Sequence, residues 1–160
     1  MLRLSLHGPL PTPRPEPIHT TIEKILATVH PAPDVMPLAP LSLTFDEAAA
    51  RLQAVPQCFL EPDGAFLIRF PPRGPAWCVE GELYDNGQLL HYVALRIRCD
   101  RGAPLPKSSS DLPLPFAELL PVFGWPHADL AVQWVESGLV ATVEDFLTWF
   151  RHWTRTHRRE

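Results

Sequence analysis

The clearest alternation of apolar and polar positions lies in residues 77–99, on both sides of a turn at Asp85, Asn86 and Gly87. Asn-Gly between two alternating runs is a strong signal for a β-hairpin. We expect a three-residue loop, because that register places apolar side chains on one face and charged ones on the other. Gly87 would then adopt the left-handed backbone conformation, which costs glycine little.

This register divides the hairpin into two faces. It pairs Leu83 with Leu89, Val79 with Val93, and Trp77 with Leu95, all on one buried face. The opposite face would hold Glu80, Glu82, Tyr92 and Arg96. His91 is expected on the apolar face opposite Gly81, where glycine leaves room for the ring, as a hydrogen-bonded core residue.

Shorter patterns predict the remaining elements of the compact part of the chain. Thr44 and Glu47 form a capping box before a helix that Pro56 ends, and Thr142 with Asp145 caps a last helix that begins at Val143. Turn residues also separate runs of apolar residues. They predict strands at 58–61 and 65–70, a short helix at 116–120, and a hairpin of 130–136 with 139–142.

The N-terminal quarter is rich in proline, which carries no amide donor and favours extended backbone. Of the chain's 20 prolines, nine precede residue 41, and five of these alternate with other residues at 9–17. The apolar spacing of residues 20–30 predicts a short helix capped by Thr20 and Glu23. We therefore expect a proline-rich arm at 1–42 and a single domain at 43–160.

Together these elements indicate an α+β domain. Strands joined by tight turns predict an antiparallel sheet of about five or six strands, a meander plus a C-terminal hairpin, with helices on one face. The order of elements over residues 43–160 is similar to that of small dimeric secretion-chaperone folds. That resemblance implies a non-enzymatic protein that binds a partner as a dimer.

Composition narrows the function classes. The 160 residues are 46% hydrophobic and 20% charged with a net charge of −4, typical of a globular domain with no general attraction to polyanions. We find no apolar run long enough to cross a membrane and expect a cytoplasmic protein. Arginine far exceeds lysine, which is typical of a GC-rich bacterial coding sequence. The cysteines Cys58, Cys78 and Cys99 lack disulfide or zinc spacing and are interpreted as buried apolar residues.

The sequence carries no complete catalytic motif. Phosphate-binding, dinucleotide-binding, zinc-protease and hydrolase signatures are all absent, and we expect no cofactor, no metal and no catalytic residue. The order helix, hairpin, helix also resembles the core of metal-dependent nucleases of the restriction-enzyme type. Ala94 and Arg96, however, stand where that family has its second acid and its lysine, and Asp85 is interpreted as a turn residue. This alternative is an inactive relative of such a nuclease.

A second enzymatic alternative is a site without a known motif. Its candidate residues are His91, Cys99, Glu80 and Glu82. This hypothesis requires the four side chains to share one cleft. Solvated carboxylates on a strand are the simpler interpretation of the two glutamates.

The leading hypothesis is a non-enzymatic interaction module of chaperone or adaptor type that binds a protein partner or a second copy of itself. Leu90, Tyr92 and Trp149 are expected to supply apolar surface for such an interface. The alternative is a nucleic-acid-binding protein that uses a basic C-terminal helix with Arg155, Arg158 and Arg159.

Overall fold

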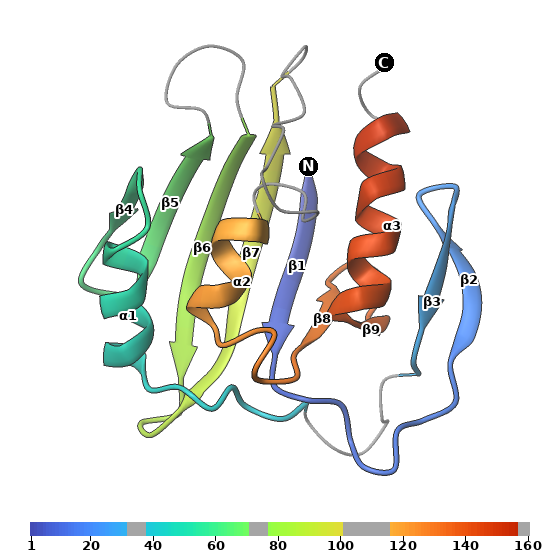
Figure 1. Ribbon diagram of the computed structural model, residues 1–160, viewed down its shortest axis with the longest axis horizontal. Helices are drawn as coiled ribbons and strands as arrows, with labels where there is room; N and C mark the ends of the chain where they lie inside the picture. Colours follow the sequence, from blue (N-terminus) through green and yellow to red (C-terminus); the bar gives the residue numbers. More distant parts are fainter. Residues whose placement is uncertain (32–37, 71–76, 101–115, 157–160) are drawn as a thin grey trace.

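The computed structural model describes residues 1–31, 38–70, 77–100 and 116–156. Within these ranges the chain forms a seven-stranded antiparallel sheet, a two-stranded hairpin and three helices (Figure 1). The helices lie on one face of the large sheet, and the hairpin stands beside the last helix. The predicted α+β class is confirmed, although the large sheet has seven strands.

The large sheet has the strand order β4-β5-β6-β7-β1-β8-β9. Its strands are β1 (Leu2–His7), β4 (Cys58–Leu60), β5 (Ala65–Phe70), β6 (Trp77–Asp85), β7 (Leu90–Cys99), β8 (Ala131–Trp134) and β9 (Val140–Thr142). The separate hairpin consists of β2 (Ile18–Ile22) and β3 (Ile25–Val29). The helices are α1 (Phe45–Gln53), α2 (Phe116–Val122) and α3 (Val143–Thr156).

Strand β1 lies in the interior of the sheet, between β7 and β8, although the sequence predicted an N-terminal arm at residues 1–42. Leu4 is paired with Leu95 of β7 on one side and with Trp134 of β8 on the other. Residues 9–17, which carry the alternating prolines, form neither helix nor strand and lead from β1 to the small hairpin. The sheet is therefore built from both ends of the described chain.

The predicted helix at residues 20–30 is wrong, because this segment forms the β2–β3 hairpin. Ile22 pairs with Ile25, and Glu23 and Lys24 form a two-residue turn with positive φ angles of 47° and 64°. Such a turn matches the right-handed twist of its two strands. The β-branched isoleucines, threonines and valine on both sides favour strands, and so short an isolated helix is marginal in water.

The central hairpin has the predicted faces but a different register. Val79 pairs with Ile97 and Leu83 with Val93, so each partner lies four residues beyond the predicted one. An even shift leaves every side chain on its predicted face. The loop is longer because the Asn86 side chain accepts hydrogen bonds from the amides of Gln88 and Leu89, at 3.1 and 3.0 Å.

Gly81 faces the helix side of β6, and the ring of Phe66 fills the space above it. A Cβ atom on Gly81 would lie only 2.0 Å from the Phe66 ring. The expectation that His91 occupies this space is wrong, because Gly81 pairs with Leu95 and the His91 side chain is exposed. The absence of a side chain at Gly81 therefore leaves room for an aromatic ring from the neighbouring strand.

We expect Gly81→Ala to lower the free energy of unfolding by about 1–3 kcal/mol, because the added methyl group overpacks the Phe66 ring. Phe66→Leu should recover part of this loss in the Gly81→Ala background, although it destabilises the parent chain. Urea unfolding of the four proteins in this double-mutant cycle measures the coupling. Strictly additive losses would show that the two side chains do not compete for the same space.

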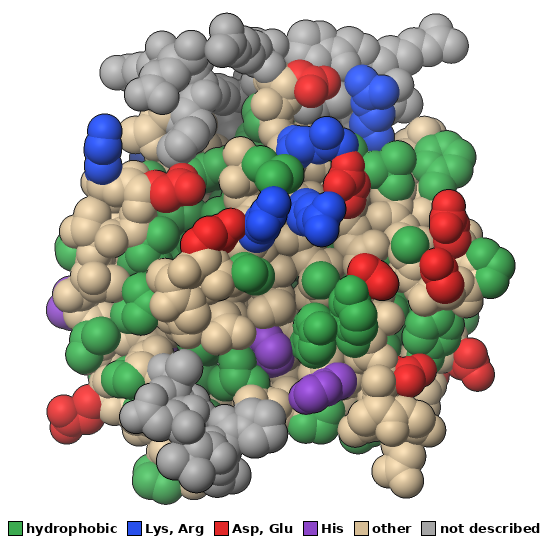
Figure 2. All heavy atoms as spheres, turned by 180° about the vertical axis from the view of Figure 1, so that it is seen from behind, with side chains coloured by type: hydrophobic (Ala, Val, Ile, Leu, Met, Phe, Trp, Pro, Cys, Tyr) green, Lys and Arg blue, Asp and Glu red, His purple; other side chains and the backbone are tan. Residues whose placement is uncertain are grey.

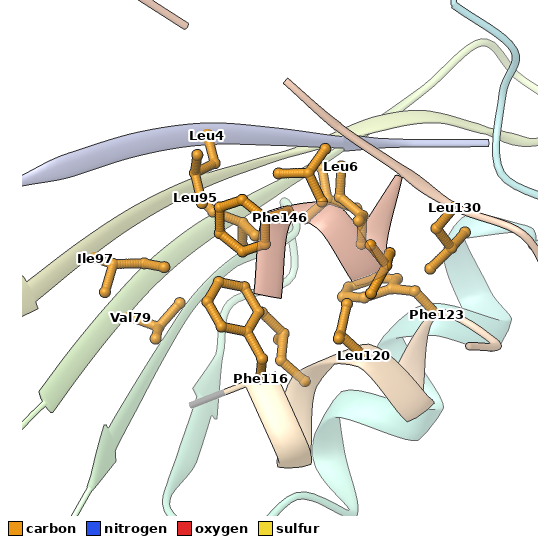
Figure 3. Packing of buried hydrophobic residues seen from close by; sticks show 14 of the residues in the cluster. Leu4, Leu6, Val79, Leu95, Ile97, Phe116, Leu120, Phe123, Leu130 and Phe146 are labelled. Atoms are coloured by element: carbon orange, nitrogen blue, oxygen red, sulfur yellow. The ribbon is translucent and has the colours of Figure 1, made fainter. Parts of the chain in front are cut away.

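The core lies between the helices and the sheet (Figure 3). Phe146 of α3 and Phe116 of α2 meet edge to face at 5.0 Å, on the side of the sheet to which Leu4 and Leu95 point. Both predicted helix caps are confirmed, because the amides of Glu47 and Asp145 donate to the hydroxyl oxygens of Thr44 and Thr142, respectively. The two caps start the helices where their apolar faces meet the sheet.

Candidate interaction surface

The sheet face that points away from the helices is the candidate site. None of the three helices in the described ranges packs on it, and Figure 2 views the molecule from this side. Strand register assigns the alternate residues of β1 and β4–β7 to this surface. The open face, as we call it, comprises Arg3, Ser5, His7, Phe59, Leu67, Arg69, Cys78, Glu80, Glu82, Tyr84, Tyr92, Ala94, Arg96 and Arg98.

The same side of the sheet is covered at its other end. Leu38 and Leu10 pack against Ala131 of β8 and Val140 of β9. Gly8 donates its amide to the Ala39 carbonyl at 2.8 Å, which holds residues 38–40 beside the end of β1. Because this end is covered, the accessible part of the sheet face is the half formed by β4–β7.

Charges of both signs alternate across the open face. Arg98 forms an ion pair with Glu80 of the neighbouring strand, and Arg69 lies 3.8 Å from Asp100. Arg3 lies 3.9 Å from Glu136 at the β8 end. These side chains are roughly half-exposed, so each pair adds little stability in water. Figure 2 shows the basic and acidic side chains intermixed on this side of the molecule.

A shallow hollow of about 160 Å³ lies between the two glutamates of β6. Glu80, Glu82, Tyr84, Ala94 and Arg96 line it. A hydrogen bond to Glu82 is the main factor that raises the pKa of the Tyr84 hydroxyl, with a smaller effect from burial. The carboxylates therefore engage an arginine and a tyrosine on an open surface, where water remains available to them.

Aromatic rings stack across three strands of the face. The rings of Tyr84 and Tyr92 are nearly parallel, with centroids 4.6 Å apart, and His7 of β1 stacks on Tyr92 at 5.7 Å. His91 meets Tyr92 edge on at 5.5 Å. We call the stack of Tyr84, Tyr92 and His7 the aromatic ladder, and it gives the face a rigid apolar strip beside its charges.

His7 is the most perturbed titratable group at this surface. Burial lowers its pKa from 6.5 to about 4, and the nearby His91 acts in the same direction, whereas a hydrogen bond to the Gln133 side chain opposes them. Its Nε2 lies 2.8 Å from the Ser5 hydroxyl, and its Nδ1 is buried without a hydrogen-bond partner in the described chain. No described carboxylate orients this ring, as a serine–histidine nucleophile would require.

Two of the residues predicted to supply apolar surface are buried instead. Leu90 is 0% exposed because its backbone pairs with Leu41 and Leu43, and Trp149 is 1% exposed because the β2–β3 hairpin covers it. Tyr92 lies on the open face, half-buried within the aromatic ladder. Arg155 is exposed on α3, and Arg158 and Arg159 lie outside the described residues.

The residues of the enzymatic alternatives do not share a cleft. His91 and Cys99 are eight residues apart on β7, which corresponds to about 26 Å along an extended strand. Asp85 accepts a hydrogen bond from the Gly87 amide at 3.1 Å, as predicted for a turn residue. Within the described ranges, no three His, Cys, Asp or Glu side chains are grouped closely enough to hold a metal ion.

The thiols of Cys58, Cys78 and Cys99 are all half-buried. Cys78 and Cys99 lie on opposite faces of the sheet, because Trp77 of the helix-facing side pairs with Cys99 and Cys78 pairs with Arg98. Burial raises the pKa of the Cys58 thiol, which lowers its reactivity at neutral pH. Nothing in their placement suggests a nucleophilic site.

Sequence reasoning missed the contribution of His7, Phe59 and Leu67 to the open face. For His7 a signal was present, because Leu2, Leu4 and Leu6 alternate with polar residues as a half-buried strand requires. Phe59 and Leu67 lie in the predicted strands but pair with each other on the outer face, where Phe59 is 66% exposed. The exposure of this pair could not be recognised in the sequence, because both residues lie within continuous apolar runs.

Comparisons with known proteins assign no family to this fold: no family model, no curated protein and no solved structure matches the chain. Among the described helices, none combines the length and the apolar character needed to span a membrane. The functional argument consequently depends on the surface itself.

Proposed function

We propose that this chain is a protein-binding module that uses the open face, and that a second copy of the chain is the partner this face fits. The observation that carries the proposal is the composition of a sheet face on which none of the described helices packs. It joins the aromatic ladder and the exposed pair of Phe59 and Leu67 to charges of both signs. Tyrosine and arginine are the residues most enriched at the energetic centres of protein interfaces.

The balance of charge favours a protein surface over a nucleic acid. The arginines of the face have acidic neighbours, among them Glu80 beside Arg98 and Asp100 beside Arg69. A phosphate backbone would have to compete with these carboxylates, whereas nucleic-acid sites present cations in excess. A protein partner can match both signs at once.

The same balance supports a second copy as the occupant. In a dimer with two-fold symmetry, the same patch meets itself, so each arginine can approach an acidic residue of the other copy. Strands β4–β7 supply a continuous sheet surface for such contact, with Phe59 and Leu67 at one side and Tyr84 at the other. Self-association therefore needs no surface beyond the open face.

We expect the protein to self-associate reversibly and Tyr84→Ala to raise the dissociation constant about tenfold or more, as for the loss of an aromatic residue that contributes strongly to an interface. Sedimentation velocity over a concentration series measures this constant. Leu26→Ser is the matched control, because Leu26 is 69% exposed on the β2–β3 hairpin and lies outside the open face. Its dissociation constant should equal that of the parent chain.

Two results would contradict the proposal. A chain that remains monomeric up to about 1 mM, the weak limit of specific association, excludes a second copy as the partner. A dimer that Tyr84→Ala leaves intact but Leu26→Ser weakens would move the interface to the hairpin. Thermal unfolding of both variants establishes that they remain folded.

A further inference from the structure

A second candidate site lies on the helix side, in the groove between α3 and the β2–β3 hairpin. This groove has a volume of about 510 Å³. Pockets for small ligands commonly occupy about 300–1,000 Å³. Its position beside α3 separates it from the open face, so it is independent of the proposed function (Figure 1).

Hydrogen bonds hold the two walls of the groove together. The Trp149 indole of α3 donates to the Ile22 carbonyl at 3.2 Å, and the Trp153 indole donates to the Glu23 carboxylate. These contacts place the hairpin turn against the C-terminal half of α3, as Figure 1 shows. The groove is thus part of the folded structure, and the Trp149 indole that lines it is held in place by its hydrogen bond.

One end of the groove is basic. Lys24 extends from the hairpin turn, and His152 and Arg155 come from the C-terminal half of α3. Neither Lys24 nor Arg155 forms an ion pair with another residue in the described ranges. Two permanent positive charges and an imidazole therefore converge where the turn meets the helix.

Asp145, the acidic residue that lines the groove, lies at its other end, whereas the Glu23 carboxylate beside Lys24 accepts the hydrogen bond from Trp153. Asp145 precedes Arg155 by ten residues, which is about 15 Å along a helix axis. Its carboxylate accepts a hydrogen bond from the Thr142 hydroxyl at 3.0 Å as part of the helix cap. His19 and Thr28, which are joined at 3.2 Å, line the hairpin wall.

The helix dipole accounts for Arg155 but not for Lys24. A cation near a helix C-terminus is favourable without any ligand. Lys24 belongs to the hairpin, however, and no helix places a charge there for structural reasons. Its position opposite Arg155 assembles charges from two separate elements, as a site for an anion requires.

We infer that this groove binds a small phosphate-bearing ligand, with the phosphate at the basic end. The Arg155 guanidinium presents paired N–H donors that match two phosphate oxygens, and the Lys24 ammonium serves a third. His152 adds a ring nitrogen that can donate a hydrogen bond. A carboxylate offers only two oxygens to these three groups, whereas a terminal phosphate offers three.

Isothermal titration calorimetry with inorganic pyrophosphate tests the inference on the full chain. We expect saturable binding, and a dissociation constant raised about tenfold or more by Lys24→Gln and by Arg155→Gln, because each removes charge-assisted hydrogen bonds. Arg69→Gln removes the same charge on the open face and should leave the affinity unchanged. Lys24→Arg, which keeps the charge, should retain most of the binding.

Other outcomes of these measurements would contradict the inference of a small phosphate-bearing ligand. Absence of saturable binding by the folded parent chain, or an equal loss in Arg69→Gln and Arg155→Gln, would overturn the inference. Binding of single-stranded RNA far more tightly than pyrophosphate, with a steep dependence on salt, would replace the small ligand with a nucleic acid. Thermal unfolding of each variant identifies any loss that comes from misfolding.

Discussion

Replacing Leu4 with alanine is expected to lower the free energy of unfolding by about 2–5 kcal/mol, the usual cost of truncating a buried leucine. Leu4 is 1% exposed and lies on β1 between its partners Leu95 and Trp134. A smaller side chain leaves a cavity at the centre of the sheet, beneath the helices. The loss should appear as a lower urea midpoint with an unchanged m-value.

Arg3→Ala is the matched control for Leu4→Ala because it lies on the same strand and points to the open face. The Arg3 guanidinium is half-exposed and 3.9 Å from Glu136, so its loss should cost less than about 1 kcal/mol. Equal and small effects of the two substitutions would mean that residues 2–7 do not belong to the sheet. That result would restore the N-terminal arm expected from the sequence.

The folded protein is expected to lose about 3 kcal/mol of stability through His7 as the pH falls from 7 to 4. The folded-state pKa of His7 is about 4, below the ordinary value of 6.5. The unfolded chain therefore binds a proton first. The contribution of His7 is complete above pH 6.5 and is lost progressively as the pH falls toward 4.

The comparison of His7→Gln with the parent chain isolates this contribution, because both proteins share the same carboxylates. Urea unfolding at several pH values should give a flatter acid profile for His7→Gln. His91→Gln controls for the neighbouring exposed histidine and should change the profile much less. Parallel profiles for His7→Gln and the parent chain would show that His7 titrates normally in the folded state.

The parts of the fold that local chemistry determines were predictable from the sequence. The helix caps at Thr44 and Thr142, and the turn between the strands at 58–61 and 65–70, lie where their residue types predict them. The alternation in β6 and β7 also predicted which side chains face the helices. Each of these features depends on residues close together in the chain, so the pattern contains the information.

Long-range pairing was not predictable in the same way. The register of β6 with β7 depends on Asn86 in the loop and on Leu41 and Leu43, which bind the backbone of Leu90. The helix expected at 20–30 failed because its spacing also fits two strands joined by a tight turn. A choice between such alternatives depends on what the segment packs against.

The same limit applied to the candidate site. Tyr92 was correctly assigned to the face opposite the core, because alternation alone determines its direction. Leu90 follows the irregularity at Tyr84 and Asp85, which ended that alternation. Trp149 was expected to be partly exposed, since the hairpin that covers it was predicted as a helix. When a segment distant in sequence buries a residue, the apolar spacing around that residue does not reveal it.

The interior position of β1, between β7 and β8, has a consequence for biosynthesis. This strand leaves the ribosome before its neighbours. Leu4 can pair with Leu95, and then with Trp134, only after those residues have been translated. The β4–β7 meander can pair as it emerges, but the free edge of β7 stays unsatisfied until the first strand inserts. Such non-local closure is slow, and an open edge on a nascent chain invites aggregation. Rapid capture of that edge by β1 is thus the step on which productive folding in the cell depends.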